Sequence, residues 1–148
     1  IEAIGVHRSG APSFDVRFPA VSDDLRFVAF TSYDRSLSPT PPVNGSNVFL
    51  LDRTSGAIRI LSARPDGAPG NRDSDRPSMS ANGACVVFAS RSSDLVSGDS
   101  NNSGDVFLWD RNTTALQRLS VSSTGQEGNA ASGFPKIVRQ GDALIAAW

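Results

Sequence analysis

The feature that most constrains this chain is an internal repeat of 58 residues, the interval from Pro19 to Pro77 and again from Pro77 to Pro135. Aligning the chain with itself at that interval needs no insertion or deletion, and the run Val48–Arg53 then falls on Val106–Arg111. A fixed period of this length is typical of tandem arrays, in which neighbouring units stack to share a core. The function should therefore be read from an array rather than from one isolated domain.

The repeat divides the chain into two full units and two partial ones. The full units span residues 18–75 and 76–133. Residues 1–17 match the end of a preceding unit, and residues 134–148 match the start of a further one. A chain of 148 residues could have been one ordinary domain, but this division predicts an array that is incomplete within the sequence.

Each unit predicts four short antiparallel strands and no helix. In the second unit, the Asn82-Gly83 turn precedes the apolar run Ala84–Ser90, and Asn-Gly is a strong hairpin signal because both residues accept positive φ. The run has almost no polar alternation, which indicates a strand buried on both faces. Two further strands are expected at 105–110 and 115–120, and no helical periodicity of useful length is present.

Repeated four-stranded meanders with buried central strands are the blades of a β-propeller, so the predicted fold class is all-β. Propellers typically close with about four to eight blades, and this sequence contains fewer than three. We therefore expect one of three arrangements. The chain is a piece of a longer polypeptide, identical chains associate to complete a ring, or the array stands open.

The second unit has the pattern Pro-x-x-Ser-x-x-Gly-x-x-Val-x-Phe-x-Ser over residues 77–90, followed by Val106–Arg111 and Arg118–Ser120. This pattern resembles the TolB-like, WD-repeat-like β-propeller repeats of bacteria. The first unit departs from it at Leu25 and Leu51, where the second has glycine and tryptophan. The resemblance implies six blades in a complete ring, or seven or eight as in related propellers, and a periplasmic or extracellular setting.

The composition excludes several functions. The chain has 14 Lys and Arg against 15 Asp and Glu, so it lacks the surplus of positive charge that binding to a nucleic-acid backbone requires. No segment approaches the roughly 18 apolar residues of a membrane span. The single cysteine, Cys85, cannot form an internal disulfide, and no signal peptide is recognisable at the start of the sequence.

One loop of the second unit predicts a calcium site. Within residues 97–105, short oxygen-bearing side chains alternate at Asp99, Asn101, Ser103 and Asp105, which resembles the first half of a calcium-binding loop. The bidentate glutamate of a complete loop is missing, and the first unit has other residues at these positions, namely Pro41, Val43, Gly45 and Asn47. The alternative is a connection rich in Asx turns, with no metal.

The loops that lead from one unit to the next predict a binding rim. They repeat a Gly-Asn pair, and they carry the candidate residues Asn71, Arg72, Asp73 and Asn129. In a propeller these loops lie on one rim of the ring, where side chains from several blades converge. The alternative is structural, because Gly and Asn also tolerate the positive φ of tight loops.

No catalytic constellation is visible. Asp52 and Asp110 recur at the same position, which favours capping of a turn, and His7 has no second metal ligand. Glu2 and Glu127 are too isolated for a glycosidase pair. We therefore expect a non-catalytic module that binds a protein or peptide partner. The alternative is the propeller part of a larger hydrolase or glycan-active enzyme, and the sequence that adjoins the two ends would distinguish them.

Overall fold

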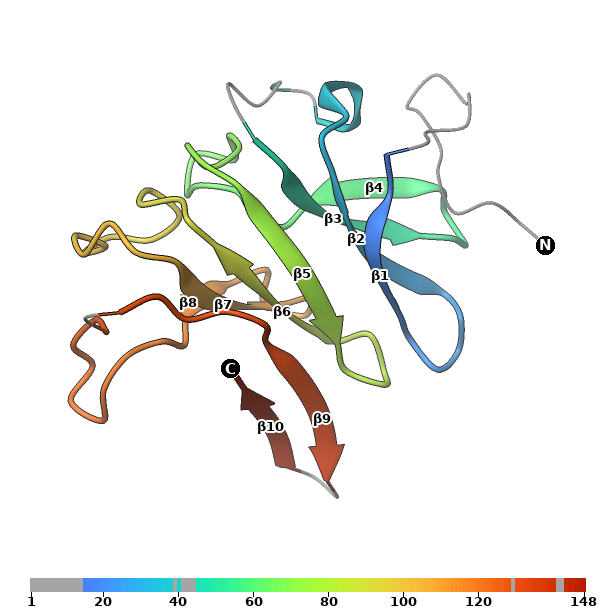
Figure 1. Ribbon diagram of the computed structural model, residues 1–148. Coiled ribbons are helices and arrows are strands. Elements are labelled where there is room, and N and C mark those ends of the chain that lie inside the picture. The colour runs from blue at the N-terminus through green and yellow to red at the C-terminus, as the bar shows by residue number, and fades with distance from the viewer. Residues whose placement is uncertain (1–14, 39, 41–44, 129, 141–142) are drawn as a thin grey trace.

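A computed structural model of the chain describes residues 15–38, 40, 45–128, 130–140 and 143–148. These residues form two four-stranded antiparallel sheets and a two-stranded hairpin (Figure 1). Residues 1–14 of the first partial unit, with Glu2 and His7 among them, lie outside the described residues.

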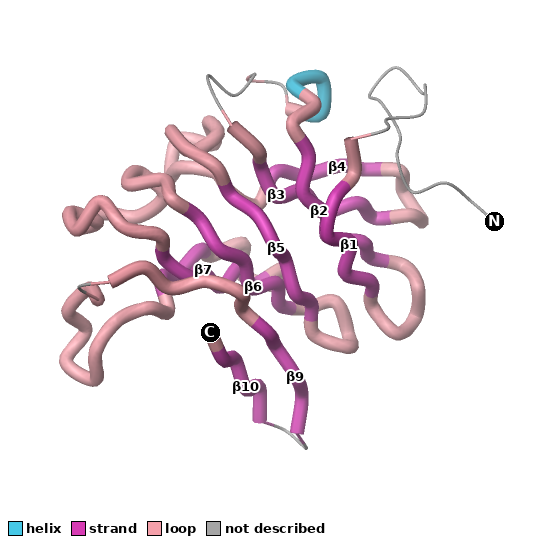
Figure 2. The backbone as a smooth tube through the Cα atoms, viewed as in Figure 1, coloured by secondary structure: helices cyan, strands magenta, loops and turns pink. Residues whose placement is uncertain are grey.

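Both sheets are meanders whose strands pair in chain order. The first contains β1 (Arg17–Val21), β2 (Phe27–Ser32), β3 (Asn47–Asp52) and β4 (Ala57–Ile60). The second contains β5 (Ser74–Met79), β6 (Cys85–Ser90), β7 (Asp105–Asp110) and β8 (Leu116–Arg118). The hairpin consists of β9 (Lys136–Gln140) and β10 (Ala143–Ala147), and a helical turn, η1 (Arg35–Leu37), follows β2 (Figure 2). Within the described part of the chain, no helix is long and apolar enough to cross a membrane.

The register of the two sheets repeats at the interval seen in the sequence. Phe27 pairs with Asp52 at the start of β2, and Cys85 pairs with Asp110 at the start of β6. The predicted strand at 105–110 coincides with β7, whereas the outermost strand β8 is shorter than predicted. The predicted boundary between the two full units, between residues 75 and 76, falls inside β5, which begins at Ser74. The division of the chain into these units stays a prediction.

The central strands are buried on both faces, as the apolar runs predicted, and the two faces of β6 pack against neighbouring layers. All six residues of β2 and of β6 are buried. Val86 and Phe88 pack against the first sheet, whereas Cys85 and Val87 face the β9–β10 hairpin. Trp109 is 5% exposed and belongs to the core between the two sheets.

Each sheet contains a stacked pair of phenylalanine rings at the equivalent position of its second and third strands. The rings of Phe30 and Phe49 stack with their centroids 5.7 Å apart, and those of Phe88 and Phe107 stack at 5.8 Å. All four side chains are almost completely buried. Burying a phenylalanine contributes about 1.5–3 kcal/mol to stability, so the repeated pair stabilises both sheets, and Phe88 and Phe107 belong to the core between them.

The turn between the first two strands of each sheet is fastened by a serine. The Ser22 hydroxyl accepts a hydrogen bond from the Phe27 amide at 2.9 Å, and Ser80 accepts one from the Cys85 amide at 2.9 Å. Leu25 occupies the left-handed region at φ +58, where the second sheet has Gly83 at φ +65. The first unit therefore keeps the backbone of the turn although it lacks the glycine.

The first strand of each layer is the innermost one. β1, β5 and β9 lie side by side (Figure 1), with β5 in contact with both of the others. The register of β1 shifts between Arg17 and Ala20, and that of β5 shifts between Asp75 and Ser78, so β1 and β5 each contain a bulge. The layers are blades of a β-propeller, and the described residues form part of a ring.

Candidate functional site

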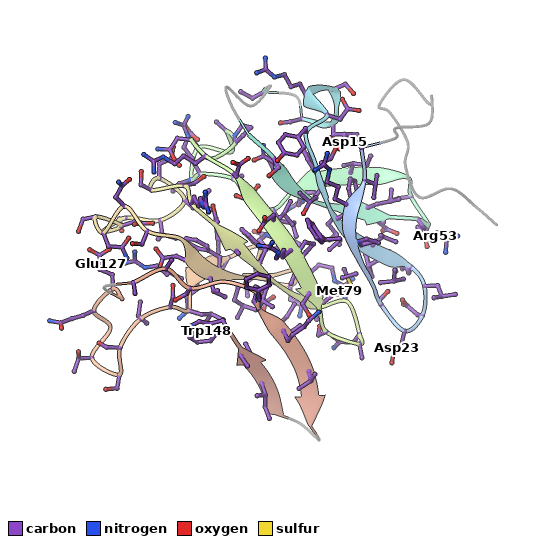
Figure 3. The ribbon with its side chains drawn as sticks, in the orientation of Figure 1. Asp15, Asp23, Arg53, Met79, Glu127 and Trp148 are labelled. Atoms are coloured by element: carbon purple, nitrogen blue, oxygen red, sulfur yellow. The ribbon has the colours of Figure 1, made fainter. Side chains whose placement is uncertain are left out.

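The loop between β6 and β7 is held by Arg118 of β8, whose guanidinium lies among three carboxylates. Nη1 of Arg118 is 3.2 Å from Glu127 Oε2, 3.5 Å from Asp99 Oδ1 and 3.7 Å from Asp105 Oδ2. The side chains of Asp99 and Asp105 are 2% and 1% exposed. Glu127 comes from the loop after β8, and it lies far from the turn at Asp23 (Figure 3). We call these four residues the Arg118 cluster.

Negative charge exceeds positive charge within the Arg118 cluster. Both carboxylate oxygens of Asp99 are buried without a hydrogen-bond partner, and burial together with the nearby charge of Asp105 raises the pKa of Asp99. Hydrogen bonds from the Ser100 hydroxyl and backbone amide lower the pKa of Glu127. The single guanidinium of Arg118 therefore lies beside two buried carboxylates and beside Glu127, which accepts hydrogen bonds from the loop.

The residues of the predicted calcium site divide between a local turn and Arg118. Asn101 Oδ1 accepts a hydrogen bond from the Ser103 amide at 2.8 Å, and Asn101 Nδ2 donates to the Gly128 carbonyl at 2.8 Å. These contacts form an Asx turn, while Asp99 and Asp105 face Arg118. In the described ranges, no three His, Cys, Asp or Glu residues are grouped to hold a metal ion. The calcium site stays a prediction.

The first blade has no charge at the equivalent positions. Its β3 carries Asn47 where the second blade has Asp105, and Asn47 Oδ1 accepts from the Ser62 hydroxyl at 2.9 Å. The Ser120 hydroxyl donates to Asp105 in the same way. Arg118 is matched by an isoleucine and Glu127 by a proline. Sequence reasoning missed the Arg118 cluster, although comparing the units for joint changes of charge would have found it.

Two of the predicted rim residues tie neighbouring blades together. Asn71 exchanges hydrogen bonds with Ser93, each at 3.1 Å. Asp73 Oδ1 accepts from the Ser46 amide at 2.7 Å and from its hydroxyl at 3.2 Å. Arg72 is exposed. Asn129 lies outside the described residues, and the binding role of the rim stays a prediction.

A cavity of about 460 Å³ opens beside this rim, at the end of the blades where β5 begins and β6 ends. We call it the rim cavity. Both blades and the segment before β9 line it, and its side chains combine two acids, two arginines and two aromatic rings: Asp73, Asp75, Arg76, Arg91, Tyr33 and Phe134. Tyr33 is 48% exposed and Phe134 is 70% exposed. Sequence reasoning placed Asp73, Asp75 and Arg76 on the predicted rim, and it did not find Tyr33, Arg91 or Phe134.

The recurring aspartates cap turns, as predicted. Asp52 Oδ1 accepts from the Thr54 amide at 3.0 Å, and Asp110 Oδ1 accepts from the Asn112 amide at 2.7 Å. A two-pronged ion pair with Arg26 holds the pKa of Asp52 well below its usual range. Cys85 is a buried free thiol, and burial raises its pKa.

Comparison with known proteins gives little beyond this geometry. No family model matches the chain, and no curated protein matches it. Among solved structures, the chain is similar to the crystal structure of TolB from Acinetobacter baumannii, at 15% sequence identity and a TM-score of 0.44. The match covers 86% of this chain and 25% of that chain, so this chain spans about a quarter of that protein's length. The propeller assignment rests on the sheets and their packing.

Proposed function

We propose that this chain is a non-catalytic propeller segment that binds a protein or peptide partner in the rim cavity. The observation that carries the proposal is the lining of that cavity by exposed Tyr33 and Phe134 together with Arg76 and Arg91. Aromatic residues and arginine are the types enriched at protein interfaces and at their energetic centres. A volume of about 460 Å³ also lies within the usual range of ligand pockets.

The position of the rim cavity favours an extended partner. Loops of both blades and the segment before β9 contribute to it, so a bound chain would contact three successive layers. Loops on a rigid scaffold are where binding residues concentrate. A periplasmic or extracellular setting, implied by the resemblance to TolB-like repeats, belongs to this proposal.

Selection from a library of dodecapeptides displayed on phage tests the proposal. Peptides enriched on the immobilised chain are synthesised, and their affinities are measured by fluorescence anisotropy. The double variant Tyr33→Ala with Phe134→Ala should weaken binding by about tenfold or more, because both rings are exposed at the cavity. Trp148→Ala is the matched control, since Trp148 is 50% exposed and does not line the cavity.

Two outcomes would overturn the proposal. One is a selection that enriches no peptide on the folded chain. The other is a set of peptides whose affinities are unchanged by the double variant, which would place their contacts elsewhere on the surface.

A further inference from the structure

The inner strands β1 and β5 and the segment just before β9 carry large side chains at three positions where the backbone disfavours them. Phe18, Arg76 and Phe134 are separated by the repeat interval, and each precedes a proline. Their φ angles are +50, +52 and +56, all in the left-handed region. A bulky residue there is a genuine outlier, and such strain tends to persist where the side chain has a task. Backbone conformation alone would favour Gly, Asn or Asp, so it does not explain these side chains.

The three side chains form one column across neighbouring layers. Cζ of Arg76 lies 4.1 Å from the ring centroid of Phe134 and 5.5 Å from that of Phe18. Both distances are within the range of a cation–π interaction. The rings come from β1 and from the segment just before β9, on either side of β5, and the Phe134 and Phe18 side chains are 70% and 48% exposed. We call this column the Phe-Arg-Phe clamp.

The guanidinium of the clamp retains donors that the described residues do not use. Arginine carries five N–H donors. The acid nearest to Arg76 is Asp75, whose Oδ2 lies 3.7 Å from Nη1, which is beyond hydrogen-bond distance. No hydrogen bond reaches the guanidinium from the described part of the chain. Because Arg76 also lines the rim cavity, these donors are available to a ligand there.

We infer that the Phe-Arg-Phe clamp binds the carboxylate of an acidic side chain in the peptide partner. A guanidinium matches a carboxylate with two parallel hydrogen bonds, and flanking rings reduce competition from water. A second guanidinium, that of Arg91, lines the same cavity. Asp73 lines this cavity as well, and its Oδ1 accepts two hydrogen bonds from Ser46. The inference rests on the proposed function and names the chemistry that its site recognises.

Asp75 provides a variant that should tighten ligand binding. Its carboxylate is the acid already beside Arg76, so it competes with the carboxylate of a ligand. Asp75→Asn should therefore tighten binding of an acidic peptide by several-fold, whereas a purely structural clamp predicts no gain. The chain also offers a matched loss variant. Arg76→Phe places in β5 the residue that the neighbouring layers carry at the same backbone angle, so it should fold while losing the cation.

The test uses defined probes so that it does not depend on the phage selection. The dipeptides N-acetyl-Asp-Phe-amide and N-acetyl-Asn-Phe-amide are titrated into ¹⁵N-labelled chain, and the Arg76 Nε–H signal is followed by NMR. That signal is assigned from its absence in Arg76→Phe. We expect a saturable shift with the aspartyl probe, at least about tenfold weaker binding of the asparaginyl probe, and tighter aspartyl binding in Asp75→Asn.

Three results would overturn the inference. Equal shifts with both dipeptides would show that the carboxylate is not recognised, and the absence of any saturable shift would show that the clamp does not bind. Equally tight binding of inorganic phosphate would make the site a general anion site. Because peptides selected on phage can still bind the rim cavity in any of these cases, failure of the clamp is distinguishable from failure of the proposed function.

Discussion

Replacing Arg118 with isoleucine tests how the second blade tolerates its buried charges. The first blade already carries isoleucine at the equivalent position, so the shape of the substitute suits the fold. In Arg118→Ile, the buried carboxylates of Asp99 and Asp105 lose the cation that lies 3.5 and 3.7 Å away. Breaking a buried ion pair from one side costs about 3–5 kcal/mol, because the remaining charge stays desolvated. We expect the free energy of unfolding to fall by that amount.

Urea unfolding followed by tryptophan fluorescence measures the loss. With a slope of about 2 kcal/mol per molar urea, the midpoint should move down by roughly 2 M. The triple variant Arg118→Ile, Asp99→Asn, Asp105→Asn is the matched control, since it removes both buried charges and resembles the uncharged first blade. It should regain most of the lost stability.

The pH dependence of the loss gives an independent check. The pKa of Asp99 is raised in the folded state, so between its unfolded and folded pKa the folded chain binds more protons than the unfolded chain. Its contribution to stability therefore increases as pH falls through the folded pKa. In Arg118→Ile, acidification from neutral pH to about pH 5 should shrink the deficit relative to the parent. A deficit below about 1 kcal/mol, or a triple variant as unstable as the single one, would refute the reasoning.

Four further predictions follow. Leu25→Gly should raise the free energy of unfolding by up to about 1 kcal/mol because it relieves a left-handed leucine, and a lower urea midpoint would contradict this. The buried Cys85 thiol should react with a disulfide reagent far more slowly in the folded chain than in urea, and rapid native reaction would count against its burial. The calcium prediction requires saturable heat when calcium is titrated to millimolar concentration in a calorimeter, and Asp99→Asn should abolish that heat. If the parent chain releases or absorbs no heat, the calcium site is ruled out. Ring completion by identical chains requires a complex of fixed stoichiometry in light scattering, and a monomer at micromolar concentration excludes it.

The strands and their order could be predicted from the sequence because their signals are local. The Asn82-Gly83 turn and the apolar run after it specify a hairpin within a few residues. The Arg118 cluster could not be predicted in the same way, because it joins β8 to a loop that is distant in the sequence. Asn101 Oδ1 is one oxygen of the calcium pattern and accepts a hydrogen bond from the Ser103 amide, while the calcium site itself stays a prediction.

The backbone angles of Phe18 and Arg76 could not be predicted from the sequence. The interval of the repeat marks Phe18 and Arg76 as equivalent, and both precede proline. A residue before proline is normally extended, so the left-handed angles found there run against the local rule. Bulges in the inner strands impose those angles, and a bulge depends on how one strand pairs with the next.

The prolines that follow these residues also disfavour pairing of β1 and β5 with strands of other chains. β1 pairs only with β2 and β5 only with β6, so in the described sheets the other edge of each inner strand carries unpaired backbone groups. Such an edge is a template for aggregation. Pro19 and Pro77 each remove one donor from it, and the adjacent bulge bends the strand away from the straight form that an incoming strand needs. We therefore expect this edge to resist pairing with strands of other chains.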